Sequence, residues 1–185
     1  RNIARKNVLL SSQALGMIKK DRDGFLPKRM HVQEHLRKIT DRRTKATLEI
    51  KAFDTSVLTG VKPAGVLIDE LHEIARNPAA ERLVGQLRGG LLPNPEAFLI
   101  FITTQSDEPP RGAFRSELMV ARAIRDGRAQ GSMLPVLYEF PEDIVDDRSD
   151  PPAWQDPKLW WMVTPNRGRS VSIERLEQEW DRAKL

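Results

Sequence analysis

Cysteine is absent from the 185-residue chain, which excludes disulfide bonds and thiolate metal sites. No apolar run is long enough to cross a bilayer, and no secretory signal pattern opens the sequence. What is present is ordinary for a globular protein, because hydrophobic residues make up 39% and charged residues 30% of the chain. The length allows one domain, or one domain with a small appendage.

The charge balance is modestly basic, with 30 Lys and Arg residues against 26 Asp and Glu residues and a net charge of +4. Such a balance is compatible with nucleic-acid binding. The chain opens at Arg1 without a methionine and in the middle of a helical pattern. We therefore expect a fragment of a longer protein.

Hydrophobic periodicity predicts alternating helices and strands. The predicted helices cover residues 1–20, 79–88 and 114–125, and a last helix is capped by Ser172. The predicted strands cover residues 48–53, 66–68, 97–102 and 134–140, and residues 31–39 are interpreted as a short helix or an irregular segment. Two of these strands are continuous apolar runs, which favours an α/β sheet that is buried on both faces and mostly parallel.

Two acids, Asp69 and Glu70, follow directly after the apolar strand at residues 66–68. Ligands of open α/β sheets bind beyond the carboxyl ends of the strands. Neighbouring strand residues point in opposite directions, so one acid can hold a metal ion while the other polarises a water molecule. P-loop NTPases use this arrangement in their Walker B element. The alternative is a strand end followed by two solvated acids.

Four polar side chains, at residues 103–106, end the next apolar strand. Hydroxyl and amide groups at such a place can sense a γ-phosphate and transmit its presence to a moving loop. The alternative is a polar strand end that satisfies its own backbone.

The composition changes after Pro141, where acids and prolines cluster, and the tail that follows holds all four tryptophans. We place a domain boundary there, between a sheet-bearing domain of residues 1–140 and a smaller subdomain of residues 141–185. The acids of 142–150 are interpreted as a solvated connector, and the tryptophans as packing for the subdomain rather than as platforms for bases.

The ordered set of these motifs resembles the large terminase subunit of tailed bacteriophages, a family of DNA-packaging motors. The resemblance rests on residues 65–72, 101–106, 134–139 and 165–170, together with tryptophans and a Pro-bearing turn in the tail: Trp154, Asp156, Pro157 and Trp160. It covers most of the chain in the expected order. The ordered set is specific, although no single motif is.

This resemblance implies an ATPase domain of the additional-strand P-loop type, with helices on both faces of its sheet, followed by a linker. It implies that Asp69 ligates Mg²⁺, that Glu70 activates the attacking water, and that Thr103, Thr104 and Gln105 couple ATP hydrolysis to movement on DNA. Arg111 and Arg115 follow the coupling motif and are candidate contacts to phosphate or DNA.

The implied cofactors are ATP and Mg²⁺. The implied partners are double-stranded DNA, a portal protein, the small terminase subunit and sibling subunits in a ring. The implied location is the host cytoplasm, with transient docking on the procapsid.

Two features of the family are missing. No Gly-x-x-x-x-Gly-Lys-[Ser/Thr] loop occurs, since Gly24 and Gly60 are not followed by the required residues, and the acids of a nuclease domain are not seen. Because the phosphate-binding loop is missing, we expect the 185-residue piece alone to bind nucleotide weakly and to turn over negligibly. Nuclease activity is expected only of a full-length protein.

Two other functions stay open at this point. Residues 69–72 also fit the Asp-Glu-x-His box of a helicase core. A non-enzymatic module for nucleic-acid binding or assembly could carry the same kind of sheet.

Overall fold

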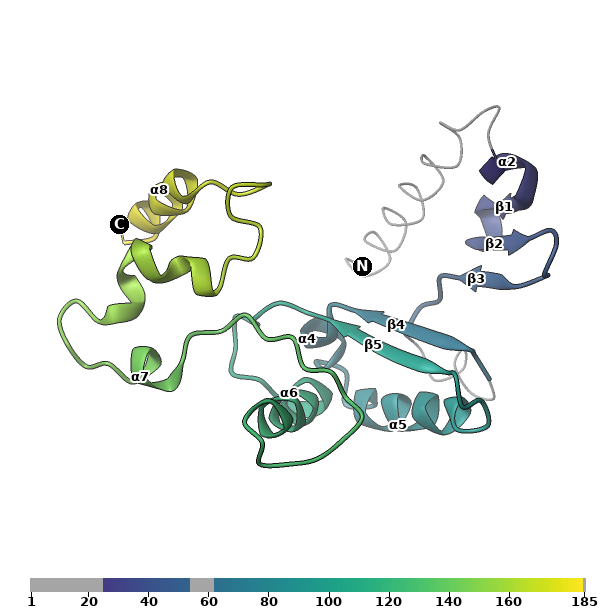
Figure 1. Cartoon of the computed structure of the whole chain (residues 1–185), viewed down its shortest axis with the longest axis horizontal. Helices are drawn as coiled ribbons and strands as arrows, with labels where there is room; N and C mark the ends of the chain where they lie inside the picture. Colours follow the sequence, from purple (N-terminus) through teal and green to yellow (C-terminus); the bar gives the residue numbers. More distant parts are fainter. Residues whose placement is uncertain (1–24, 54–61, 185) are drawn as a thin grey trace. The chain divides into compact units, whose positions relative to one another are not determined.

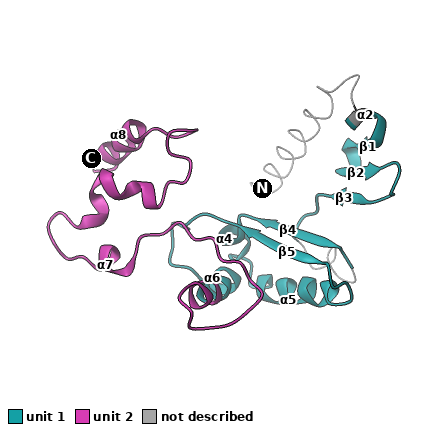
Figure 2. Ribbon diagram, in the orientation of Figure 1, with its two compact units in different colours: residues 1–119 teal, residues 120–185 magenta. Residues whose placement is uncertain are grey.

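The computed structural model describes residues 25–53 and 62–184, which form an α/β arrangement with two small sheets (Figure 1). The predicted helix at residues 1–20 lies outside the described residues. The chain divides into two compact units, residues 1–119 and 120–185 (Figure 2). Along the chain, the boundary between the units falls inside helix α6, Gly112–Arg125. The division at residue 140 stays a prediction.

The first sheet is antiparallel and begins directly after the short helix α2, Phe25–Arg29. Its strands, in spatial order, are β1 (Met30–Gln33), β2 (Lys38–Asp41) and β3 (Thr47–Glu49).

The interpretation of residues 31–39 as a short helix or an irregular segment was therefore wrong. The segment forms a hairpin in which Val32 pairs with Ile39, and the 3-10 turn η1 (Glu34–Leu36) connects its strands. Arg37 closes this turn in the left-handed conformation. These residues form strands because they pair with each other, and the hydrophobic periodicity of the sequence does not reveal such pairing.

The second sheet is parallel and holds the two apolar runs, which form β4 (Gly65–Asp69) and β5 (Phe98–Ile102). The connection between them carries helices α4 (Leu71–Ile74) and α5 (Ala80–Leu91). A helical crossover of this kind is what two adjacent parallel strands require. The predicted strands at 66–68 and 97–102 are confirmed.

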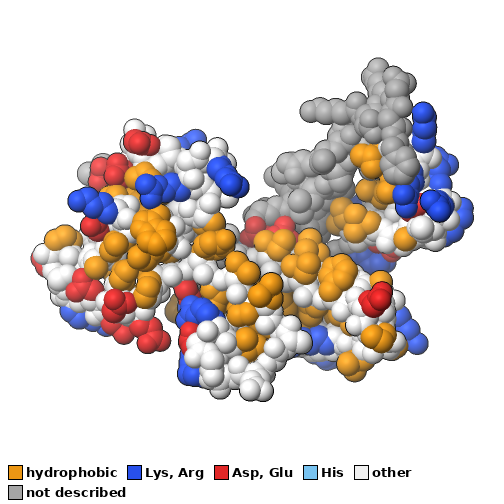
Figure 3. Space-filling model, in the orientation of Figure 1, with side chains coloured by type: hydrophobic (Ala, Val, Ile, Leu, Met, Phe, Trp, Pro, Cys, Tyr) orange, Lys and Arg blue, Asp and Glu red, His pale blue; other side chains and the backbone are white. Residues whose placement is uncertain are grey.

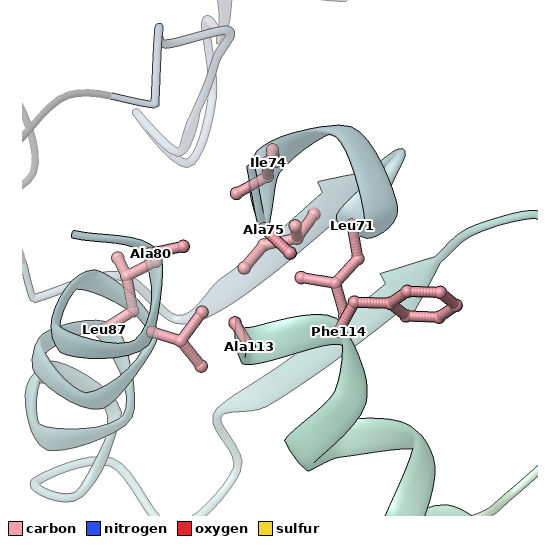
Figure 4. Close-up of a cluster of buried hydrophobic side chains, with 9 residues drawn as sticks. Leu71, Ile74, Ala75, Ala80, Leu87, Ala113 and Phe114 are labelled. Carbon is pink, nitrogen blue, oxygen red and sulfur yellow. The ribbon is translucent and has the colours of Figure 1, made fainter. Parts of the chain in front are cut away.

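One face of β4 and β5 packs against helices (Figure 1). Small and branched side chains from one strand and three helices form the buried cluster of Figure 4: Ile68, Leu71, Ile74, Ala75, Ala80, Val84, Leu87, Ala113 and Phe114. Burial of this cluster is the main stabilising contribution to this part of the chain.

The opposite face is not buried by the described residues, contrary to the expectation of burial on both faces. Leu67 is 58% exposed, and Phe98, Ile100 and Ile102 of β5 are 56%, 44% and 50% exposed. Figure 3 shows hydrophobic side chains gathered over these strands. The wide parallel sheet of P-loop NTPases is likewise not confirmed, because the described residues form only two parallel strands.

Helix α5 begins later and runs further than predicted. Asn77 precedes it in a turn, where its side-chain oxygen accepts a hydrogen bond from the backbone N–H of Ala79 at 2.9 Å. The predicted end at residue 88 was wrong, since the helix continues through Gly89 and Gly90 to Leu91. Leu91 is buried, and this packing outweighs the cost of about 1 kcal/mol that each glycine imposes on a helix.

Residues 134–140 do not pair with another strand in the described part of the chain, so the strand predicted there is wrong as a sheet element. Exposure along the segment nevertheless alternates, with Leu134, Val136 and Tyr138 exposed. Ion pairs from α6 hold its end: both Arg122 and Arg125 bind the carboxylate of Glu139.

The tail is built from short helices: α7 (Glu142–Val145), η2 (Ala153–Gln155), η3 (Pro157–Met162) and α8 (Ile173–Ala183). The hydroxyl of Ser172 caps α8, as predicted, by accepting a hydrogen bond from the N–H of Arg175 at 3.2 Å.

Three of the tail's tryptophans pack together. The Trp180 ring lies edge-on to Trp154 at 5.5 Å and to Trp160 at 6.4 Å between centroids. The indole N–H of Trp160 donates to the carbonyl of Trp154 at 3.0 Å. These contacts fit the predicted packing role.

None of the helices in the described ranges combines the length and the apolar character that a membrane crossing requires.

Candidate functional site

The carboxyl ends of β4 and β5 lie side by side. In the parallel ladder Asp69 is the partner of Ile102, so the residues that follow each strand emerge at the same edge of the sheet. The acids predicted as catalytic and metal-binding and the polar run predicted as coupling residues are therefore neighbours. This edge is the candidate site.

Asp69 is the last residue of β4 and is half-buried. Its carboxylate has no hydrogen bond or ion pair with the described residues. In the described ranges no three acids or histidines gather closely enough to hold a metal ion by themselves. A single carboxylate still suits Mg²⁺, which commonly binds one or two protein oxygens and completes its shell with water and phosphate.

Glu70 adopts a left-handed backbone conformation, with φ 56° and ψ 51°. This region costs a non-glycine residue about 1–2 kcal/mol, and strain of this kind clusters at functional sites. The residue lies between the end of β4 and the start of α4, at the N-cap position of that helix. Burial of Leu71 and Ile74 in the core holds the turn in place.

His72 connects the two strand ends. Its backbone N–H donates to the hydroxyl oxygen of Thr103 at 3.2 Å, and its ring Nδ1 lies 3.0 Å from the same oxygen. Its other ring nitrogen, Nε2, lies 3.4 Å from Oε2 of Glu70 and 3.6 Å from Oε1 of Glu73. The side chain is only 10% exposed.

The remaining polar side chains of the β5 end do not reach the acids. Thr104 and Gln105 are exposed, and the hydroxyl of Ser106 donates to the carbonyl of Glu108 in its own loop. Of the three predicted coupling residues, Thr103 is the one that contacts His72 within the described ranges, and His72 in turn lies 3.4 Å from Glu70. The coupling roles of Thr104 and Gln105 stay predictions.

The two candidate arginines differ in their surroundings. Arg111 forms an ion pair with Glu108 at 3.1 Å, whereas Arg115 is exposed on α6 and makes no ion pair with the described residues. A depression of about 10 Å³ between His72 and Arg111 has room for roughly one water molecule. It is too small for a phosphate chain.

Two residues with defined contacts at this edge were not among the site residues predicted from the sequence. His72 belonged to the acidic run, but only the fold reveals its contact with a residue 31 positions away. Arg76 donates to Asp107 at 2.6 Å and ties α4 to the loop after β5. Hydrogen bonding from Arg76 holds the pKa of Asp107 below its ordinary value, and Asp107 in turn raises the pKa of Arg76.

No protein-family model and no curated protein matches this sequence. The structure is similar to the crystal structure of the HK97 bacteriophage large terminase, with a TM-score of 0.71 and 14% sequence identity. The match covers 97% of this chain and 34% of that chain, so the chain spans about a third of that protein's length. At this identity the likeness is one of fold, and the fold of the chain is terminase-like.

Proposed function

We propose that this chain is part of an ATP-driven motor that packages double-stranded viral DNA into a capsid. The observation that carries the proposal is the ladder that places the end of β4, with Asp69 and Glu70, beside the polar end of β5. The similarity of the fold to a large terminase supports the same function.

ATP is the substrate in this proposal, and Asp69 is the residue that would hold Mg²⁺. When bound, Mg²⁺ neutralises charge on the phosphate oxygens. Glu70 accepts a hydrogen bond from the attacking water and orients it in line with the γ-phosphate. Thr103, Thr104 and Gln105 sense the γ-phosphate and transmit its loss to the loop that follows β5.

Arg115 is the better candidate for a contact to phosphate or DNA, because Arg111 is already paired with Glu108. Contacts of Lys and Arg with the DNA backbone do not depend on sequence, which suits a translocating motor. The proposed partners are DNA, a portal protein, a small terminase subunit and sibling subunits in a ring. The complex would act in the host cytoplasm on the procapsid.

Substitution of Glu70 by Gln in the full-length protein tests this proposal. The amide keeps the shape of the side chain but orients water poorly, so the hydrolysis rate should fall by at least about 100-fold. Glu96→Gln is the matched control, because Glu96 is exposed before β5 and lies outside the site. Equal hydrolysis by both variants would contradict the motor and favour a non-enzymatic module.

A helicase core is the second candidate, and the contact between His72 and Thr103 favours it. That contact joins the Asp-Glu-x-His box to the hydroxyl residues that resemble a helicase coupling motif. Strand displacement on a forked duplex by the full-length protein would support the helicase. ATP-dependent movement along duplex DNA without unwinding would support the packaging motor.

A further inference from the structure

We propose that His72 is the positioning residue that ties the Glu70 carboxylate to the end of β5, so that a shift of Thr103 displaces Glu70. This inference rests on the proposed function, and it identifies the link by which the coupling residues control the catalytic acid. The ring stands between the two strand ends and presents one nitrogen to each.

The hydrogens available at His72 support this role. The carboxylates of Glu70 and Glu73 only accept hydrogen bonds when ionised, so Nε2 is the nitrogen that carries a hydrogen toward them. The hydroxyl of Thr103 accepts from the backbone N–H of His72 and has one hydrogen of its own to donate.

That hydrogen has two acceptors within reach. Thr103 Oγ1 lies 3.0 Å from Nδ1 of His72 and 3.2 Å from the carbonyl oxygen of Thr104. When Nδ1 accepts it, a hydrogen bond joins Thr103 to the ring, whose Nε2 lies 3.4 Å from the Glu70 carboxylate. A rotation of the hydroxyl toward Thr104 breaks the bond between Thr103 and the ring without displacing the backbone.

The ring is fixed from a third side. Phe114, at the start of α6, lies edge-on to His72 at 6.3 Å between ring centroids and is itself buried in the core. With 10% of its side chain exposed, His72 has little freedom to move independently of its neighbours. A displacement of Thr103 is therefore passed on to the strained Glu70 turn.

Steady-state hydrolysis by the full-length protein provides the test. His72→Phe keeps a ring of similar size against Phe114 but removes both nitrogens. It should lower kcat by about tenfold to 100-fold with the KM for ATP changed less than about twofold, because a misplaced group loses rate rather than binding. His72→Gln, which can both donate and accept, should recover part of the loss, and His35→Phe is the control at an exposed histidine.

A double-mutant cycle with Thr103→Val identifies the link itself. If both residues act through one contact, His72→Phe combined with Thr103→Val should be no slower than the worse single variant. If the kcat loss of the double variant equals the product of the two single losses, the proposal is overturned. Thr103→Ser, which keeps the hydroxyl, should lose less kcat than Thr103→Val.

A measurement independent of activity separates the two proposals. In ¹⁵N-histidine NMR spectra, the signals that disappear in the His72→Phe variant are assigned to His72. Thr103→Val should shift the Nδ1 signal and leave the Nε2 hydrogen in place, and an unchanged Nδ1 signal would overturn the link.

The inference alone fails if Glu70→Gln abolishes hydrolysis while His72→Phe leaves kcat unchanged. The proposed function fails if Glu70→Gln leaves hydrolysis intact, whatever the NMR spectra show.

Discussion

The guanidinium of Arg88 donates a hydrogen bond at 2.6 Å to the carboxylate of Glu117, and this pair joins α5 to α6. Glu117 is one of two buried polar or charged residues in the described part of the chain, with 8% of its surface exposed. Arg88 also lies over the ring of Phe101 in β5, 5.9 Å from its centroid. One arginine thus connects both helices to the strand that precedes the predicted coupling residues.

Removal of Arg88 should destabilise the protein. Arg88→Met leaves the buried Glu117 charge without its partner, and the free energy of unfolding should fall by about 1–3 kcal/mol. Arg82→Met, at an exposed position of the same helix, should change it by less than about 0.5 kcal/mol. Urea unfolding measures both.

The double variant Arg88→Met with Glu117→Leu should lie closer to the unsubstituted protein than Arg88→Met alone, because no charge is then left buried. A double variant less stable than Arg88→Met would show that the pair contributes more than the avoidance of an unpaired charge.

Gly112 should not tolerate a side chain. Its φ is +51°, and a Cβ atom there would lie 3.1 Å from the carbonyl oxygen of Ala75. Gly112→Ala should therefore lower the free energy of unfolding by about 1–2 kcal/mol. Gly89→Ala has open space in α5 and should raise it by about 0.5–1 kcal/mol. Thermal unfolding of both variants measures whether Gly112→Ala lowers and Gly89→Ala raises the stability of the protein.

The strain at Glu70 predicts a difference in stability between two variants that lack its carboxylate. Glu70→Gly and Glu70→Ala both remove the carboxylate, but only glycine relieves the left-handed conformation. Glu70→Gly should be more stable than Glu70→Ala by about 1 kcal/mol in chemical denaturation. Equal stabilities would indicate that the turn relaxes out of the left-handed region when the carboxylate is removed.

Glu139 should make stability depend on pH. Burial raises the pKa of Glu139, but the hydrogen bonds from Arg122 and Arg125 lower it by more than burial raises it. The pKa therefore lies below the ordinary value of 4.5. A carboxyl group with a lowered pKa in the folded state stabilises the protein fully above about pH 4.5. This stabilisation is lost as the pH falls through the lower value.

Urea unfolding between about pH 5 and pH 3 measures this dependence. Glu139→Gln should flatten the fall of the unfolding free energy across that range, whereas Glu142→Gln, at an exposed position in α7, should leave it unchanged. An identical slope for Glu139→Gln and the unsubstituted protein would show that the contacts of Arg122 and Arg125 add nothing to stability.

Much of the site could be predicted from sequence because its signals are local. The apolar runs that became β4 and β5 are continuous, and the polar residues that end them are adjacent in the chain. The parallel ladder then places both ends at one edge, with Asp69 opposite Ile102. Predictions that depended on whether a segment pairs with another strand fared worse, as the hairpin at 31–39 and the unpaired segment at 134–140 show.

By itself, the sequence determined where the strands of the parallel sheet end and which polar groups those ends carry, because strand propensity and side-chain type belong to each residue. Only the tertiary structure decided that His72 reaches Thr103, that Glu70 takes a left-handed turn, and that α5 continues past its glycines to bury Leu91. The physical reason is that these outcomes depend on contacts between segments distant in the chain, whose packing and hydrogen-bond energies exceed local conformational preferences.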